Sequence, residues 1–237
     1  MCGICGIVNY NGNQVDKGLL EKMTNLLEYR GPDDAGYYFN RDSAERGPKS
    51  GLGMRRLSVI DLATGHQPIH NEDKSIWIIS NGEIYNFLLL KKELESKHKF
   101  YTKTDTEVIL HLYEEHGVDC LKYLRGMFAF AVWDENKDQL FMARDRLGQK
   151  PLYYTNINGS FYFASEIKCF LKIPGFKKEI KKEAINYYLT YQYIPSPMTI
   201  YDGVYSLKPA HYLLINRENV PSKKRKAAFA IAFRAEI

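Results

Sequence analysis

The second residue of the chain carries a thiol at a position that can become the N-terminus. The sequence begins Met1-Cys2-Gly3, and cysteine is small enough for the initiator methionine to be removed. Cys2 would then carry a free α-amine, whose reference pKa of roughly 7.7–8 makes it a usable proton acceptor near neutral pH. Such an amine can activate the thiol of its own residue, directly or through a water, so no separate histidine is required. The pattern is compatible with a nucleophile at Cys2, although the position alone favours an incidental cysteine.

Cys2 and Cys5 also form a C-x-x-C pair, a spacing found in redox and zinc sites. A zinc site needs further ligands, but Cys120 and Cys169 are isolated in the sequence and the six histidines form no paired motif. If a strand over residues 4–9 extends back through Cys2, the two side chains point to opposite faces of the sheet. We therefore expect neither a redox pair nor a metal site here.

Three polar clusters downstream could complete a site around such a nucleophile. They are Arg55–Asp61, Asn81–Asn86 and Thr102–Glu107. An enzyme that attacks the carboxamide of an amino acid needs an arginine for the α-carboxylate, acidic groups for the α-ammonium and two N–H donors for the oxyanion. Each cluster alone has a simpler explanation, because Asn81-Gly82 is a common hairpin turn, Asp105 a helix cap and Arg56 a surface charge.

Hydrophobic periodicity predicts the elements that position these clusters. Strands are predicted over residues 4–9, 35–39, 51–60, 76–80, 127–133, 139–143, 152–155, 161–164 and 212–215. Helices are predicted over residues 17–28, 87–97, 106–116 and 166–171, with Thr104 or Asp105 capping the third. The Asn81–Asn86 cluster follows its strand immediately, as a tight turn would. Beyond Lys172 the pattern loosens, and no element is predicted within Lys223–Ile237.

Strands joined mostly as hairpins, with two consecutive helices inserted, indicate an α+β fold rather than a repeated βαβ winding. The fully apolar run Phe128–Val132 is typical of a strand that is buried on both faces. Two antiparallel sheets with helices outside them account for such strands.

Composition narrows the class of protein. The 237 residues are 45% hydrophobic and 26% charged, which excludes a disordered or collagen-like chain and fits one large domain with at most an appendage. No apolar run approaches the roughly 20 residues of a membrane helix and no signal pattern precedes the first strand, so we expect a soluble, cytoplasmic protein. The net charge of +5 comes from residues 172–237, with 12 Lys and Arg against 5 Asp and Glu. These lysine runs are typical of a solvated surface and not of a nucleic-acid face.

Six motifs occur together along the chain. They are Met1-Cys2-Gly3-Ile4, Arg30-Gly31-Pro32-Asp33, Arg56-Leu57-Ser58, Asn81-Gly82-Glu83-Ile84-Tyr85-Asn86, Gly126-Met127-Phe128-Ala129-Phe130 and Ala143-Arg144-Asp145-Arg146-Leu147-Gly148. In this order and spacing they resemble the N-terminal glutaminase domain of glutamine-hydrolysing asparagine synthetases, a class II (N-terminal-nucleophile) glutamine amidotransferase. The resemblance covers about residues 1–216. It implies a four-layer α-β-β-α sandwich of two antiparallel sheets, which agrees with the fold expected from the hydrophobic pattern.

The resemblance implies catalytic roles for the matching residues. Cys2, once Met1 is cleaved, would attack the side-chain carboxamide of L-glutamine, and its α-amine would act first as base and then as acid toward the departing ammonia. Water would hydrolyse the resulting thioester to glutamate. Asn81 and Gly82 would form the oxyanion hole, while Arg30 and Asp33 would brace the site rather than react.

The resemblance also implies how the substrate is held. Arg56 would bind the α-carboxylate of glutamine. Glu83 and Asp105 would line the amino-acid pocket, together with Asn81 and Gly82, and the backbone of Val59 and Ile60 would complete it.

In the family, this domain feeds ammonia to a C-terminal synthetase domain that adenylates aspartate with ATP. No Ser-Gly-Gly-rich pyrophosphate loop or P-loop occurs in the sequence, so we expect that domain to be absent and residues 217–237 to form a divergent basic tail. The glutaminase step then needs no cofactor or metal, since ATP and Mg²⁺ belong to the absent domain.

The expected partners are L-glutamine and a synthetase domain or separate protein that accepts ammonia. Neither nucleic acid nor a membrane is expected as a partner, and a homodimer stays open. The alternative is a truncated, catalytically idle fragment or a regulatory glutamine-binding module.

Overall fold

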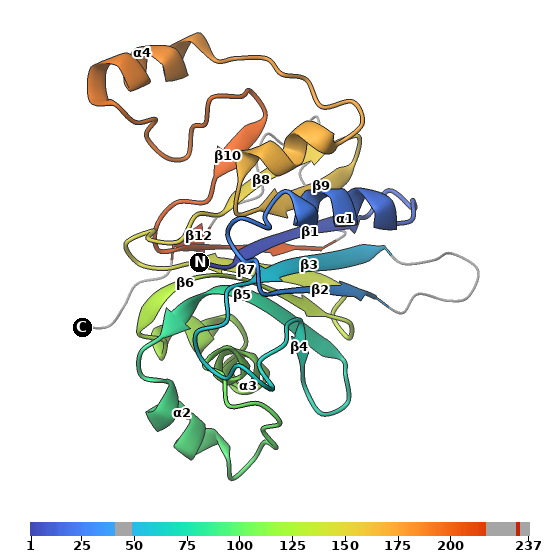
Figure 1. Ribbon diagram of the computed structural model, residues 1–237, viewed down its shortest axis with the longest axis vertical. Coiled ribbons are helices and arrows are strands. Elements are labelled where there is room, and N and C mark those ends of the chain that lie inside the picture. The colour runs from blue at the N-terminus through green and yellow to red at the C-terminus, as the bar shows by residue number, and fades with distance from the viewer. Residues whose placement is uncertain (41–48, 217–230, 233–237) are drawn as a thin grey trace.

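The apolar runs of the sequence form strands, and Figure 1 shows their arrangement in a computed structural model that describes residues 1–40, 49–216 and 231–232. The strands are β1 (Gly3–Asn9), β2 (Asp34–Phe39), β3 (Ser50–Arg56), β4 (Ile69–His70), β5 (Ile76–Ile84), β6 (Gly126–Asp134), β7 (Gln139–Arg144), β8 (Tyr153–Ile157), β9 (Ser160–Ala164), β10 (Val204–Ser206), β11 (His211–Ile215) and β12 (Ile231–Ala232). The α-helices are α1 (Lys17–Asn25), α2 (Phe87–Leu94), α3 (Thr106–His116) and α4 (Lys182–Tyr191), and the 3₁₀ helices are η1 (Gly117–Lys122) and η2 (Ile167–Lys172).

The strands form two sheets in which every pairing is antiparallel. The first sheet has the order β10-β8-β9-β1-β3-β2, and the second has the order β12-β11-β7-β6-β5-β4. β3 and β5, whose ends carry two of the predicted site clusters, therefore lie inside their sheets rather than at an edge, as does β1, which Cys2 precedes.

Alternate residues of the strands pack on opposite sides of each sheet. In β6, Ala129, Ala131 and Trp133 belong to the core between the two sheets, whereas Phe128 and Phe130 face α3 on the outside. The prediction that this run is buried on both faces is confirmed.

Helices cover the outer face of each sheet. Leu20 and Met23 of α1 pack with Cys5 and Ile7 of β1 on the first sheet, and the side chain of Asp16 caps this helix by accepting a hydrogen bond from the Leu19 N–H. Apolar residues of α2 and α3 pack on the outer face of the second sheet. Figure 1 shows the resulting order of helix, sheet, sheet and helix, which confirms the predicted α-β-β-α sandwich.

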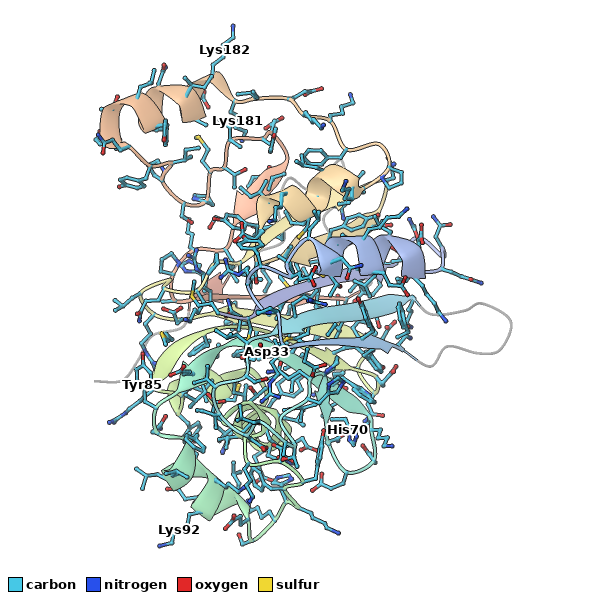
Figure 2. All side chains as sticks on the ribbon, in the orientation of Figure 1. Asp33, His70, Tyr85, Lys92, Lys181 and Lys182 are labelled. Atoms are coloured by element: carbon cyan, nitrogen blue, oxygen red, sulfur yellow. The ribbon has the colours of Figure 1, made fainter. Side chains whose placement is uncertain are left out.

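α4 was not predicted, and it stands apart from the four layers (Figure 1). Ala184 is its one buried residue, while Ile185, Tyr188 and Leu189 are exposed. Figure 2 places Lys181 and Lys182 at this end of the molecule and Lys92 of α2 at the opposite end, so these lysines do not share one face.

Several predicted boundaries were wrong. The strand expected over residues 51–60 ends at Arg56, the helix expected over 87–97 ends at Leu94, and the segment expected as a helix over 166–171 is 3₁₀. β10 was also missed. Within the tail, Ile231–Ala232 pairs with β11 although no element was predicted there, and the rest of 217–237 lies outside the described residues. None of the described helices is long and apolar enough to cross a membrane.

Candidate active site

A pocket of about 170 Å³ opens where β1, β3, β5 and the N-terminal end of α3 meet. All eight residues predicted for the site line it: Cys2, Arg56, Val59, Ile60, Asn81, Gly82, Glu83 and Asp105. They come from four separate segments of the chain. The fold therefore brings the three predicted clusters together around the predicted nucleophile.

Cys2 immediately precedes β1 and is held from two sides. Its Sγ lies 3.4 Å from the Leu57 N–H and 3.6 Å from the Leu57 carbonyl oxygen, and its own carbonyl accepts a hydrogen bond of 3.0 Å from Nε of Arg30. Arg30 also pairs with Glu166. Burial raises the pKa of the Cys2 thiol, against smaller opposing effects of the Leu57 backbone and nearby positive charge. A protonated thiol needs a base before it can attack.

Cys5 does not share this environment. It is fully buried on the outer face of the first sheet, where its Sγ lies 3.3 Å from Oγ1 of Thr24 in α1, and burial raises the pKa of its thiol to about 12. Cys2 instead packs against the core between the sheets. The prediction that the two cysteines face opposite sides of the sheet is confirmed, so they form neither a dithiol pair nor half of a metal site.

Arg56 anchors the loop that forms one wall of the pocket. Its side chain is buried, and Nη2 donates hydrogen bonds of 2.8 Å and 2.7 Å to the carbonyl oxygens of Ile60 and Asp61. This loop carries Val59 and Ile60 into the pocket. Since a guanidinium has five N–H donors in a planar fork, the donors on Nε and Nη1 are not used by these two bonds.

Asp33 braces the same loop from its other side. Its Oδ2 accepts a hydrogen bond of 2.8 Å from the Ser58 N–H. Figure 2 shows Asp33 near the middle of the molecule. Arg30 and Asp33 thus hold backbone atoms around Cys2, as the bracing role predicted for them requires.

Asn81 and Gly82 lie inside β5 rather than in the turn that their sequence favours. The ladder with β6 is continuous, and Asn81 pairs with Ala129 and Gly82 with Phe128. Asn81 is almost fully buried, and its Nδ2 has no hydrogen-bond partner among the described residues. A buried amide donor without an acceptor is costly, so an oxygen that enters the pocket would gain a strong contact there.

Asp105 joins the end of β5 to the start of α3. Its Oδ2 accepts a hydrogen bond of 2.7 Å from the Ile84 N–H, and its side chain makes no capping bond. Thr104 supplies that contact instead, through a 3.4 Å bond from the Glu107 N–H to its Oγ1. Burial, reinforced by the nearby Glu83 carboxylate, raises the pKa of Asp105. A ligand with a positive charge would stabilise the ionised form of Asp105.

Comparison with known proteins places this arrangement in a family. The family described as "Glutamine amidotransferase domain" matches residues 1–226. The chain belongs to this family.

Two curated relatives of this amidotransferase domain have similar names. "Asparagine synthetase [glutamine-hydrolyzing] 1" of Bacillus subtilis strain 168 is 42% identical over 219 residues, which cover 91% of this chain and 33% of the relative. "Putative asparagine synthetase [glutamine-hydrolyzing] 2" of Methanocaldococcus jannaschii is 39% identical, over 94% of this chain and 46% of the relative. The resemblance seen in the sequence is confirmed, and the chain spans between a third and a half of the length of these relatives.

A solved structure supports the fold independently. The glutamine phosphoribosylpyrophosphate amidotransferase of B. subtilis superposes with a TM-score of 0.66 at 20% sequence identity, over 92% of this chain and 48% of that one. At this identity the likeness concerns the fold alone.

Several residues of the amidotransferase pocket were not predicted. They are Met1, Leu57, Gln67, Ser80, Thr104, Thr106, Met127 and Lys150. Gln67 ties two walls together, because its Oε1 accepts a 2.7 Å bond from the Ser80 N–H and its Nε2 lies 3.4 Å from Oγ1 of Thr106. Lys150 follows a turn held by Asp145, whose carboxylate accepts bonds from three backbone N–H groups. The Asp145 motif was the available signal for Lys150, whereas no local pattern points to Gln67.

The pocket of the amidotransferase domain offers one thiol and two carboxylates, from Cys2, Glu83 and Asp105. Among the described residues, one group of His and Glu side chains lies close enough together to hold a metal ion, and it lies outside this pocket.

Proposed function

We propose that the chain hydrolyses L-glutamine to glutamate and ammonia, with Cys2 as the nucleophile after removal of Met1. The observation that carries this proposal is the buried Nδ2 of Asn81, which has no partner within the described part of the chain and lies in the same pocket as the Cys2 thiol. A nucleophile and a fixed donor without an acceptor are what acyl transfer through an oxyanion requires.

The proposed reaction begins when the α-amine of Cys2 takes the thiol proton and Sγ attacks the side-chain carbonyl carbon of glutamine. Negative charge then develops on the carbonyl oxygen, which Asn81 Nδ2 and the backbone N–H of Gly82 stabilise. The protonated amine gives its proton to the departing nitrogen, which leaves as ammonia, and a thioester on Cys2 remains. Water attacks the thioester, releases glutamate and restores the thiol.

The remaining pocket residues orient the substrate in this proposal. Arg56 holds the α-carboxylate with the guanidinium donors that are not bonded to the loop. Asp105 and Glu83 face the α-ammonium, and the backbone of Val59 and Ile60 closes the pocket. This step needs neither a cofactor nor a metal.

We further propose that a synthetase domain or a separate protein takes up the ammonia. The relatives that match are named as glutamine-hydrolysing asparagine synthetases and are two to three times as long as this chain. An apolar face on α4, formed by Ile185, Tyr188 and Leu189, is exposed and available to such a partner. ATP and Mg²⁺ would act in that partner, in a transfer of ammonia to aspartate.

A second candidate function is that of a glutamine-binding module without turnover. It applies to a chain that retains Met1, which lines the pocket with its Sδ 3.4 Å from Nζ of Lys150. While Met1 is present, its peptide bond occupies the nitrogen of Cys2 and no α-amine is available there as base. A chain that retains Met1 would bind glutamine and not hydrolyse it.

Glutamate release and glutamine binding distinguish the two functions. The Met1-processed chain is compared with Cys2→Ala, and with Cys5→Ala as the matched control on the opposite face of β1. We expect glutamate release to vanish in Cys2→Ala while calorimetric binding of glutamine persists, and Cys5→Ala to keep its activity. Binding without release by the processed wild-type chain would establish the binding module instead.

A further inference from the structure

A second group of ionisable side chains lies on the outer side of the second sheet. This His–Glu cluster consists of Glu72, His98, His111 and Glu114. Glu72 lies between β4 and β5, His98 follows α2, and the other two are on α3. Residues far apart in the sequence thus meet here, and the proposed glutaminase chemistry uses none of them.

Two of the three nearest spacings within the His–Glu cluster are close to the ligand spacing around a small divalent ion, and the third is a hydrogen bond. Nδ1 of His98 lies 3.7 Å from Oε1 of Glu72 and 3.6 Å from Oε2 of Glu114, and Nδ1 of His111 lies 2.7 Å from that same Oε2. One possible ligand atom from each residue lies within 4.8 Å of all the others. Zinc bonds of about 2.1 Å at tetrahedral angles separate ligand atoms by about 3.4 Å.

Each imidazole of the cluster also has a carboxylate at its other ring nitrogen. Nε2 of His98 lies 3.2 Å from Oε1 of Glu115, and Nε2 of His111 lies 3.7 Å from Oε1 of Glu107. Histidines that bind a metal usually direct their second N–H to a carboxylate or carbonyl, which fixes the tautomer and the orientation of the ring. His98 follows this pattern, and Nε2 of His111 faces Glu107 at a distance longer than a hydrogen bond.

The other oxygen of Glu114 is held as well. Oε1 of Glu114 accepts a 2.8 Å bond from Nδ2 of Asn71, which leaves Oε2 directed at the two histidines. Oε1 of Glu72 accepts a 2.8 Å bond from the Lys99 N–H. Both candidate carboxylate ligands are therefore oriented by neighbouring amides.

Burial and charge favour a cation at this place. The side chains of His111 and His98 are 1% and 11% exposed, and Nε2 of His111 has no hydrogen-bond partner among the described residues. With Glu107 and Glu115 included, four carboxylates surround two imidazoles, while Lys97 pairs with Glu115 alone. Glu107 is fully buried and the Glu114 side chain is 17% exposed, so a divalent ion would add favourable positive charge beside these two carboxylates.

We propose that the His–Glu cluster binds one Zn²⁺ ion in a closed, four-ligand structural site. With the ion on Nδ1 of His111, the proton of that ring lies on Nε2 and faces Glu107. The site then fastens α3 to the loops on either side of it. Because Glu107 also accepts bonds from the N–H groups of Tyr101 and Thr102, the ion steadies the segment that leads to Asp105 in the pocket.

Zinc binding is measured on the tag-free 237-residue chain carrying Cys2→Ala, so that the accessible thiol takes no metal. Equilibrium dialysis should give one Zn²⁺ per chain, and Co²⁺ in its place should give the visible absorption of a tetrahedral site. Since a ligand that binds only the folded state stabilises it, Zn²⁺ should also raise the melting temperature.

Variants locate the site. His98→Gln and Glu72→Gln should each weaken Zn²⁺ binding by at least about 100-fold, and Glu115→Gln by roughly 10–100-fold through the orientation of His98. His116→Gln removes an exposed imidazole from the end of α3 and should leave binding unchanged. Metal-free His98→Gln and Glu72→Gln should melt close to the metal-free parent chain, which separates lost binding from lost folding.

Two results would overturn the proposal. If fewer than one Zn²⁺ binds per chain and the melting temperature does not rise, the carboxylates are neutralised by protonated imidazoles without a metal. If binding is as tight in His98→Gln and Glu72→Gln as in the parent chain, zinc binds elsewhere. Neither result affects the proposed glutaminase activity, which is measured separately on the chain that retains Cys2.

Discussion

The side-chain amide of Asn81 is the pocket group best placed to donate a hydrogen bond to the substrate. Its Nδ2 is buried and no described residue accepts a hydrogen bond from it. If it stabilises the oxyanion, Asn81→Ala should lower kcat for glutamate release by about 10²–10³-fold and change KM little, because the contact strengthens only as charge develops.

The matched control for Asn81 is Asn156 on β8, whose Nδ2 is also buried with no partner among the residues that the structure describes, but which lies outside the pocket. Asn156→Ala should keep kcat near that of the wild type in steady-state assays. Equal losses in the two variants would mean that Asn81 acts through stability and not through the oxyanion.

The raised pKa of Asp105 predicts opposite effects on stability and on binding. Because burial raises this pKa, the ionised carboxylate destabilises the fold at neutral pH, and that cost disappears as the pH falls through the pKa of the folded state. Asp105→Asn should therefore melt at an equal or higher temperature than the wild type at pH 7, with the difference shrinking in acid. Its KM for glutamine should rise roughly 10–100-fold, since the α-ammonium loses a charged partner.

Asp73 serves as the comparison, because its pKa is shifted in the direction opposite to that of Asp105. Hydrogen bonds from Ser75 lower the pKa of this exposed carboxyl. Its ionised form stabilises the fold above its unfolded pKa, so Asp73→Asn should melt slightly lower at pH 7 and leave KM unchanged. A clearly lower melting temperature for Asp105→Asn at pH 7 would contradict the account of Asp105.

Among single residues, the sequence predicted those that carry chemistry better than those that support them. Cys2, Arg56, Asn81 and Asp105 belong to motifs whose residue types suggest a task, and all of them line the pocket. Gln67 has no such signature. It reaches the pocket only because the loop after β3 returns to the second sheet, and that path depends on contacts between distant residues.

Among the elements, the junction of β5 and β6 sets the position of Gly82. A Cβ atom there would lie 2.2 Å from the Met127 carbonyl oxygen and 2.6 Å from Cα of Phe128, both of them backbone atoms. Gly82→Ala should therefore push the two strands apart and lower the free energy of unfolding by at least about 1–3 kcal/mol. Denaturant unfolding measures this change.

The matched control is Gly18 in α1, where a Cβ atom would meet only Oδ1 of Asp16, at 3.4 Å. Gly18→Ala should stabilise the protein by up to about 1 kcal/mol, because alanine favours the helix. If Gly82→Ala unfolded at the same denaturant concentration as the wild type, the claim that the β6 backbone leaves no room for a Cβ atom at this position would be contradicted.

The elements also show where local sequence signals fail. Asn81-Gly82 favours a tight turn, yet both residues continue β5 because β6 pairs with it along its full length. The helix at Thr106–His116 was predicted to the residue, since its apolar face and its start are encoded locally. Strand ends that depend on a partner strand cannot be found in this way.

For the whole molecule, the order of hairpins and helices and the fully apolar run Phe128–Val132 were sufficient to predict two sheets with helices outside them. α4 escaped prediction because Ala184 is its one buried residue and its large apolar side chains, among them Ile185 and Leu189, are exposed. Without one buried stripe, the helical periodicity is lost. The proposed domain boundary after residue 216 stays a prediction.

The most direct test of the central claim is the mass of the chain during turnover. The processed protein is mixed with glutamine, quenched in acid within one turnover and measured intact and as peptides. The account predicts a chain without Met1 that carries one glutamyl group on Cys2 and releases glutamate, and Cys2→Ala should carry none. Glutamate release without an adduct on Cys2, or equal release from Cys2→Ala, would contradict it.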